Sequence, residues 1–203
     1  MVVTPWQCAR DPKDFTIKLI GMTRIAERTV LFADLRGSTA LYETLGNAEA
    51  TSVVTHTVAA LGRAVPACGG TLVKTLGDGL MAVFSSPAEG LQSAQQMHEA
   101  LDQIVSRGRE RGASPGLRSL RLQVALARGE VVEMGGDCFG DAVNVSARLI
   151  DHASDNETLL TAEVLAGLPP DTGQRLRSLG WMHLRGRAEP VQVHVMGGRR
   201  GLD

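Results

Sequence analysis

Residues 74–79 read Lys-Thr-Leu-Gly-Asp-Gly and stand between two β-prone apolar runs, residues 71–73 and residues 80–84. Glycines on both sides of Asp78 permit positive φ and let a ligand approach the backbone closely. The stretch therefore predicts a β-hairpin with a carboxylate at its tip and a lysine on one arm. Gly-Asp-Gly is also an ordinary turn sequence, so this motif alone leaves a purely structural interpretation open.

A second carboxylate, Asp34, follows the apolar strand predicted for residues 29–33. Residues 35–39 come next, where a long helix is expected to begin. Two strand-end aspartates near a helix N-terminus could supply hard oxygen ligands to divalent cations, while the terminal N–H groups face a phosphate. An aspartate before a helix is also an ordinary cap, so the second motif is equally ambiguous when taken alone.

A third stretch, residues 137–149, reads Asp-Cys-Phe-Gly-Asp-Ala-Val-Asn-Val-Ser-Ala-Arg-Leu. It predicts a turn and then a helix on which Asn144 and Arg148, four residues apart, share a face. Taken in order with residues 32–39 and 74–79, this stretch closely resembles the catalytic domain of the class III nucleotidyl cyclases.

The resemblance covers approximately residues 28–197 and implies an α+β fold. The expected architecture is a ferredoxin-like βαββαβ core with additional C-terminal strands and helices. Residues 1–27 are then an N-terminal extension or linker, in which residues 15–20 could be a strand or the end of a linker, and residues 198–203 are a C-terminal tail.

The chain order of the predicted elements agrees with that core. Helices are expected from the apolar spacing of residues 54–65 and residues 87–104, and a strand is expected at residues 120–126. Residues 130–134 are expected to continue it as a hairpin arm after Gly129.

Composition favours a soluble intracellular protein. The chain has 203 residues, an apolar fraction of 43% and a net charge of −1, which suits one well-formed core and implies neither nucleic acid nor an anionic membrane as partner. Cys8, Cys68 and Cys138 lie far apart, so neither a disulfide framework nor a zinc site is expected. No apolar run approaches membrane-spanning length and no signal peptide is evident, so a cytoplasmic location is expected.

The resemblance implies roles for the two aspartates. Asp34 and Asp78 match the metal-binding positions and would hold two divalent cations, Mg²⁺ or Mn²⁺, with the backbone carbonyl of Leu35 as a further ligand. Two carboxylates are the smallest protein bridge for a pair of ions that neutralises an attacking and a leaving oxygen.

The resemblance also implies roles for the basic and amide side chains. Asn144 matches the residue that orients the ribose, and Arg148 matches the residue that stabilises charge on the transferred phosphoryl group. Either Arg185 or Arg187, with a preference for Arg187, would contact the terminal phosphates.

Base choice depends on Lys74 and Asp137, which match the positions that read the purine. Adenine offers an acceptor at N1 and a donor at N6, so a lysine and an aspartate complement it. Family members specific for GTP carry Glu and Cys at these places. The neighbouring Cys138 would occupy the Asp137 position only if the alignment with the family were shifted by one residue. The resemblance therefore implies adenylate cyclase activity on ATP.

Three alternatives stay open at this stage. A guanylate cyclase is one. A diguanylate cyclase is another, because residues 135–139 read Gly-Gly-Asp-Cys-Phe; here Cys138 replaces an essential acid, and the stretch is expected to run into a helix rather than return along a hairpin. A catalytically silent cyclase-like module for dimerisation or nucleotide sensing is the third.

Partners are also implied by the resemblance. The family draws its lysine and transition-state arginine from one protomer and its two aspartates from the other. A chain that carries all of them is expected to act as a homodimer with two equivalent sites. A regulatory domain outside this chain is compatible with the sequence.

Overall fold

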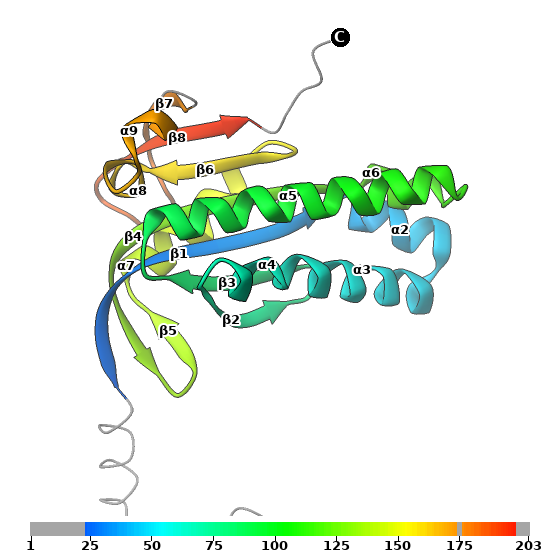
Figure 1. The fold of residues 1–203 in the computed structure, drawn as a ribbon, viewed down its shortest axis with the longest axis horizontal. Helices are drawn as coiled ribbons and strands as arrows, with labels where there is room; N and C mark the ends of the chain where they lie inside the picture. Colours follow the sequence, from blue (N-terminus) through cyan, green and yellow to red (C-terminus); the bar gives the residue numbers. More distant parts are fainter. Residues whose placement is uncertain (1–22, 174–175, 198–203) are drawn as a thin grey trace, which may run out of the picture.

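The computed structural model describes residues 23–173 and 176–197, so residues 15–20 lie outside the described part. In these ranges the strands form one eight-stranded sheet in the order β2-β3-β1-β4-β6-β8-β7, with β5 paired to β4 (Figure 1). The elements are β1 (Arg24–Arg36), α2 (Ser38–Leu45), α3 (Asn47–Gly62), α4 (Ala64–Ala67), β2 (Thr71–Leu76), β3 (Gly79–Phe84), α5 (Pro87–Glu110), α6 (Pro115–Ser119), β4 (Arg121–Met134), β5 (Asp137–Phe139), α7 (Asp141–Leu149), the 3₁₀ helix η1 (Ile150–His152), β6 (Glu157–Thr161), α8 (Ala162–Ala166), α9 (Pro170–Gly173), β7 (Arg177–Met182) and β8 (Val191–Gly197).

Residues 24–134 form the expected ferredoxin-like core. Strands β2, β3, β1 and β4 lie side by side and every neighbouring pair is antiparallel. Strand β6 then pairs parallel to β4, and β8 and β7 extend the sheet on that side. The predicted α+β fold with additional C-terminal strands and helices is therefore confirmed.

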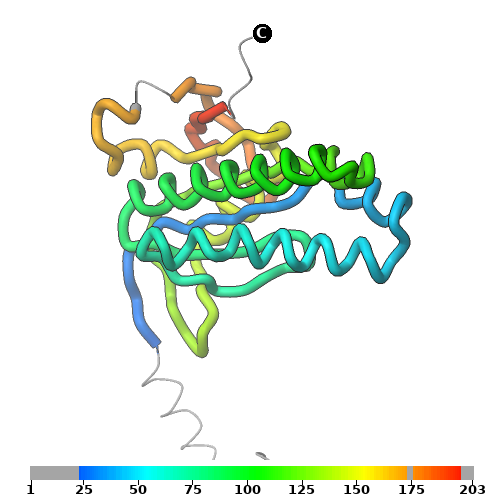
Figure 2. Tube along the Cα trace, turned by 45° about the vertical axis from the view of Figure 1, so that its right-hand side comes forward, coloured from blue at the N-terminus to red at the C-terminus, as the bar shows by residue number. Residues whose placement is uncertain are grey.

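The central strand β1 serves two hydrophobic cores because successive side chains point to opposite faces of a sheet. Leu31 and Ala33 pack in the core that contains the buried residues of α3 and α5. Val30 packs in a second core with Val145 and Leu149 of α7. Figures 1 and 2 show α3 and α5 side by side across one face of the sheet, which leaves α7 on the other face.

Helix α5 begins as its sequence predicts. Ser86 is the N-cap, its hydroxyl accepts from the Glu89 amide, and the Glu89 carboxylate accepts in turn from the Ser86 amide. Pro87 occupies the first turn, where a missing N–H costs nothing. This reciprocal cap fixes the start of the longest helix in the described ranges.

The long helix expected after Asp34 is instead two helices. Strand β1 continues to Arg36, and α2 ends at Leu45 because Gly46 takes a positive φ of 75°. Helix α3 then starts at Asn47 on a new axis, and its residues Val54, Val58 and Leu61 are buried as the apolar spacing predicts.

The hairpin expected at Gly129 is also wrong. Strand β4 runs unbroken through that residue, because Gly129 is paired across the sheet with Arg28. The turn falls instead at Gly135 and Gly136, whose φ values of 60° and 82° suit a two-residue hairpin. Residues 135–139 therefore do return along a hairpin, β4–β5, before α7 begins, contrary to the sequence-based expectation.

The C-terminal region forms the two strands predicted around a basic turn, with Trp181 of β7 opposite Gln192 of β8. Of the helices that the structure describes, none combines the length and the apolar character that a membrane span requires.

Candidate active site

The structure brings Asp34 and Asp78 together at one end of β1. Asp34 pairs with Gly79, so Asp78 in the β2–β3 turn is its close neighbour, and the Leu35 N–H donates to the Asp78 carbonyl over 3.1 Å. A Cβ on Gly79 would lie 2.7 Å from the Ala33 carbonyl oxygen and 3.2 Å from Asp34 Oδ1. Glycine at this position is therefore what lets the hairpin tip approach the Asp34 carboxylate.

The electrostatics of this pair suit a cation. Burial, and then the negative charge of Asp78, raise the pKa of Asp34 to about 6, while the Arg36 guanidinium acts in the opposite direction. Arg36 Nε lies 3.9 Å from Asp34 Oδ2, too far to neutralise the carboxylate fully. Carboxylate oxygens that repel one another are hard ligands for Mg²⁺ or Mn²⁺, so the donor set fits the divalent ions implied by the sequence.

No group of three or more His, Cys, Asp or Glu side chains is placed to hold a metal ion in residues 23–173 and 176–197. The side-chain ligands that this end of β1 offers are thus the two carboxylates. Backbone carbonyls such as that of Leu35 would have to complete the coordination.

Three further residues hold this end of the sheet, and sequence patterns did not single them out. Ser38 Oγ donates to Asp78 Oδ2 over 2.9 Å. Arg36 Nε donates to Gln123 Oε1 over 2.6 Å, and the amide nitrogen of buried Gln123 donates to the Ala153 carbonyl. From sequence alone, a serine at the start of a helix such as Ser38 is interpreted as a capping residue, and a glutamine in a strand such as Gln123 is expected to be exposed. Their roles at this end of the sheet become visible only in the tertiary contacts.

Lys74 and Asp137, the two residues that the resemblance assigns to purine recognition, are in contact. Lys74 Nζ donates to both carboxylate oxygens of Asp137 at 2.8 Å each, and the Cys138 amide donates to Asp137 Oδ1 over 2.8 Å. The hydrogen bond from Lys74, followed by the one from Cys138, lowers the pKa of Asp137 below its usual value. A register shift in β2 between Leu72 and Lys74 sets the direction of the lysine, and the β4–β5 hairpin carries Asp137 to it.

Helix α7 presents Asn144 and Arg148 away from the sheet. Ser146, fully buried, donates to the carbonyls of Val30 and Ala125 over 3.3 Å and 2.9 Å, which fixes the rotation of the helix. Asn144 is exposed, whereas Arg148 is half-buried beside the β7–β8 loop. A Cβ on Gly186 of that loop would lie 3.6 Å from Arg148 Nη2, so the loop and the guanidinium are in contact distance.

The two candidate arginines of the β7–β8 loop differ in their surroundings. Arg187 donates through Nη1 to the carboxylate of Asp141, the first residue of α7, and its backbone N–H donates to the Leu184 carbonyl over 3.1 Å. Arg185 is exposed. The structure therefore brings Arg187 to the helix of Asn144 and Arg148, through an Asp141 contact that sequence reasoning missed.

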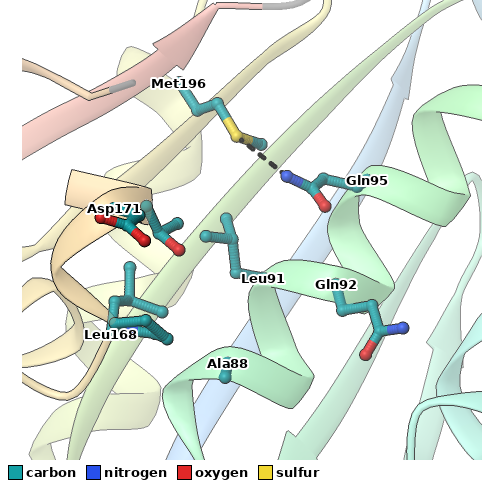
Figure 3. A pocket seen from close by; sticks show the side chains of 9 residues that line it. Ala88, Leu91, Gln92, Gln95, Leu168, Asp171 and Met196 are labelled. Atoms are coloured by element: carbon teal, nitrogen blue, oxygen red, sulfur yellow. Dashed lines mark hydrogen bonds between the residues drawn. The ribbon is translucent and has the colours of Figure 1, made fainter. Parts of the chain in front are cut away.

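One cavity, of about 290 Å³, lies elsewhere and contains none of the predicted site residues. Figure 3 shows Leu91 and Gln95 of α5 facing Leu168, Asp171 and Met196, with Gln95 Nε2 donating to Met196 Sδ over 3.5 Å. It lies on the α5 side of the sheet, opposite α7.

The sheet order and the paired residues are those expected of a nucleotidyl cyclase catalytic domain. The sequence model of the adenylate and guanylate cyclase catalytic domain matches residues 20–197. The chain belongs to this family.

Curated relatives support the same assignment. An adenylate cyclase of Anabaena cylindrica is 26% identical over 188 residues, which cover 86% of this chain and 38% of the relative. A pH-sensitive adenylate cyclase of Mycobacterium tuberculosis is 31% identical over 176 residues, which cover 85% of this chain and 41% of the relative. The chain thus spans less than half the length of either relative.

Solved structures share the fold. The adenylyl cyclase CyaB from P. aeruginosa superposes with a TM-score of 0.74 at 21% identity, covering 89% of this chain and 99% of that one. The guanylyl cyclase Cya2 gives a TM-score of 0.70 at 22% identity, covering 90% of this chain and 98% of that one. Both activities therefore occur among proteins of this fold, so base specificity has to be argued from the site.

Proposed function

We propose that this domain is an adenylate cyclase that converts ATP to 3′,5′-cyclic AMP and pyrophosphate. The observation that carries the proposal is the Lys74–Asp137 pair, in which a donor and an ionised acceptor lie side by side. Lys74 can donate to adenine N1 and Asp137 can accept from N6. Guanine has its donors and acceptors reversed on that edge, so neither Lys74 nor Asp137 would find a hydrogen-bond partner on it. Leaving both groups unpaired would lower the binding energy of GTP.

The reaction requires charge to be neutralised on three groups. The ribose 3′-hydroxyl loses its proton to solvent and its oxygen forms a new bond to the α-phosphorus. The bond from that phosphorus to the oxygen bridging the α- and β-phosphates breaks, and pyrophosphate leaves. Mg²⁺ or Mn²⁺ held by Asp34, Asp78 and the Leu35 carbonyl would activate the hydroxyl and stabilise the leaving group.

The other side chains act by position and fixed charge. Asn144 orients the ribose so that its 3′-oxygen approaches the phosphorus in line. Arg148 supplies charge-assisted hydrogen bonds to the phosphoryl oxygens, where negative charge grows in the transition state. Arg187 contacts the terminal phosphates, and Arg185 is the second candidate for that contact.

We further propose that the active form is a homodimer. Leu72 and Leu76 of β2 are 40% and 47% exposed, and Phe139 of β5 is 48% exposed. These apolar side chains flank the Lys74–Asp137 pair on the two elements that carry it, as expected of a surface covered by a second copy. Each site would then combine Asp34 and Asp78 of one protomer with the purine, ribose and phosphoryl residues of the other.

The chain covers less than half of the relatives named above, so control by a domain outside it fits the proposal. A cytoplasmic setting, where ATP is abundant, suits the activity.

The proposal is tested by incubating purified protein with Mn²⁺ or Mg²⁺ and either ATP or GTP, and by measuring cyclic nucleotide and pyrophosphate by mass spectrometry. We expect cyclic AMP and pyrophosphate in equal amounts, with a clear preference for ATP. A preference for GTP would make the domain a guanylate cyclase. If a confirmed dimer released no pyrophosphate, the domain would instead be a catalytically silent module for dimerisation or nucleotide sensing.

A further inference from the structure

Arg36 is a cationic side chain at the metal end of β1 for which the proposed reaction has no use so far. Asp34 and Arg36 are two residues apart on one strand, so their side chains point to the same face of the sheet. Val30 shares that face and packs in the core that contains the buried residues of α7. Arg36 Nε lies 3.9 Å from Asp34 Oδ2, and the Arg36 side chain is 47% exposed. A guanidinium therefore faces solvent beside the carboxylate that would hold the metal ions.

Gln123 fixes the direction of this guanidinium. It is only 4% exposed and is paired across the sheet with Asp34. Its Oε1 accepts from Arg36 Nε over 2.6 Å, and its Nε2 donates to the Ala153 carbonyl. An arginine that served only as the counter-ion of Asp34 would donate to that carboxylate directly. Here the Nε of Arg36 donates to a neutral, buried amide instead.

The two remaining nitrogens of the guanidinium are available to a ligand. Nη1 and Nη2 of Arg36 donate no hydrogen bond to any residue in the ranges 23–173 and 176–197. The planar guanidinium presents its donors as a fork that matches two oxygens of a phosphate. Because Gln123 already holds Nε, the direction of the fork is set before a ligand arrives, which lowers the entropy lost on binding.

The charges at this end of β1 indicate an anion with several negative charges. Divalent cations held by Asp34 and Asp78 would repel a guanidinium that lies so close to Asp34. An anion in contact with both the ions and the guanidinium removes that repulsion. The polyphosphate of ATP is such an anion, and its two terminal phosphates gain further negative charge when they leave.

We propose that Arg36 is a further triphosphate-binding residue and that Gln123 is the positioning residue that directs it. Nη1 and Nη2 of Arg36 donate to oxygens of the phosphates that leave as pyrophosphate. Arg36 comes from the protomer that supplies Asp34 and Asp78, so the polyphosphate is held from both sides, by Arg36 of one copy and Arg187 of the other. This inference rests on the proposed function.

The test measures binding without turnover. Manganese tripolyphosphate, which has the metal and the phosphates of the substrate but no base, is titrated by calorimetry, and Mn²⁺ alone is titrated by electron paramagnetic resonance. In Arg36→Gln the affinity for manganese tripolyphosphate should fall roughly 10–100-fold, the usual value of hydrogen bonds to a charged group. The affinity for Mn²⁺ alone should stay equal or rise, because a positive charge beside Asp34 is gone. Arg36→Lys keeps the charge without the fork and should fall between parent and Arg36→Gln.

A role as counter-ion alone predicts the opposite sign. If Arg36 only neutralised Asp34, Arg36→Gln would bind manganese tripolyphosphate as tightly as the parent or more tightly, and this result would overturn the proposal while the proposed function stands. A parent protein that does not bind manganese tripolyphosphate at all would contradict the proposed metal and phosphate site and, with it, this inference.

Arg63→Gln is the matched control, because Arg63 is an exposed arginine at the end of α3, on the face of the sheet opposite α7. It should bind manganese tripolyphosphate like the parent. An equal loss of affinity in Arg63→Gln would show that the effect comes from net charge and would contradict a contact made by Arg36.

Gln123→Met tests the positioning role, because it removes the amide that holds Arg36 Nε and keeps the length of the buried side chain. The released guanidinium can turn to Asp34, so the affinity for manganese tripolyphosphate should fall several-fold. Added to Arg36→Gln, the same substitution should cause no further loss, since Gln123 acts only through Arg36. Equal losses with and without Arg36 would show that Gln123 supports the fold and would contradict its positioning role.

Discussion

When no metal ion is bound, the negative charge of Asp34 lowers the free energy of unfolding of the protein. Its pKa is raised from 3.8 to about 6, first by burial and then by Asp78. Because the folded pKa lies above the unfolded one, this carboxylate destabilises the fold as pH rises from 3.8 through 6, and the full cost is present at neutral pH. A divalent cation would remove that cost.

Asp34→Asn should therefore separate stability from activity. Without metal, the variant should melt at a temperature equal to or higher than that of the parent, since a repelling charge is gone. With Mn²⁺ the parent should gain melting temperature and the variant should gain less. Turnover of ATP should fall on the order of 100-fold or more, because the metal charge at the reacting phosphate is lost.

Asp171→Asn is the matched control, because Asp171 is an exposed aspartate of α9 that lines the separate cavity beside α5. It should keep the Mn²⁺ response and the turnover of the parent. Near-normal turnover of Asp34→Asn or Asp78→Asn at saturating metal and ATP would remove the two aspartates from the metal site.

Lys74→Glu should alter base choice. The substitution places an acceptor where adenine N1 needs a donor and leaves two carboxylates facing each other at Asp137. The ratio of kcat/KM for ATP to that for GTP should fall at least tenfold, about 1.4 kcal/mol. Adding Asp137→Cys should relieve the repulsion and lower the ratio further. Parental ATP kinetics in Lys74→Glu would exclude purine recognition by this residue.

At the scale of elements, the hydrophobic patterns of the helices predicted the structure well, whereas the positions of glycines did not predict where helices and strands end. The apolar spacing of α3 and α5 follows directly from burial on one face. The alternation of apolar residues with Arg121, Gln123 and Ala125 predicts a half-exposed strand, but this prediction is wrong: β4 is buried on both faces from Leu122 to Ala127, because each face of the sheet carries its own hydrophobic core. A glycine can end a helix, as Gly46 does, or continue a strand, as Gly129 does. Which of these occurs depends on the cross-strand partner, and a single sequence does not contain that information.

The same limit explains which site contacts could be predicted. The Lys74–Asp137 pair follows from a family resemblance over three motifs, and the structure places the two side chains in contact. The contacts of Ser38 with Asp78 and of Asp141 with Arg187 join residues 40 and 46 positions apart and have no motif of their own. They become visible only when the strands and helices are packed.

Helix α5 carries a half-buried histidine, His98, that links its packing to pH. His98 Nε2 lies 3.0 Å from Thr158 Oγ1 of β6, and burial lowers the pKa of His98 from 6.5 to about 4. The folded protein therefore keeps this histidine neutral, while the unfolded chain takes up a proton below pH 6.5. Stability from this group is complete above that pH and is lost as pH falls towards 4.

His98→Gln should accordingly make the protein less sensitive to acid. The free energy of unfolding of the parent should fall by up to about 3 kcal/mol more than that of the variant between pH 7 and pH 4. Urea unfolding at several pH values measures this difference. His56→Gln, at an exposed histidine of α3, should follow the parent curve; identical curves for parent and His98→Gln would show that His98 is not the acid-sensitive group.

At the scale of the whole molecule, the exposed apolar side chains of β2 and β5 should mark the contact between two copies. Leu72→Glu with Phe139→Glu should convert a dimer into monomers in analytical ultracentrifugation and remove ATP turnover. Leu179→Glu, on the edge strand β7 and 37% exposed, is the control that should leave both unchanged. An active dimer of the double variant would place the interface elsewhere.

The division into an extension at residues 1–27, a catalytic domain at residues 28–197 and a tail at residues 198–203 stays a prediction. Strand β1 begins at Arg24 and pairs with β4 from its first residue, so the sheet includes residues just before the predicted boundary. Truncation before and after Arg24 would locate the start of the folding unit.

The central claim is a site shared between two copies of the chain, and mixed dimers test it most directly. Asp34→Ala and Arg148→Ala should each be inactive alone, because every site of either homodimer lacks one essential group. After exchange in equal amounts, about half of the dimers contain one chain of each kind and have one intact site of two, so activity should recover to roughly a quarter of the parental value. If mass measurement confirms exchange and the mixture stays as inactive as its components, the two copies do not share their active sites.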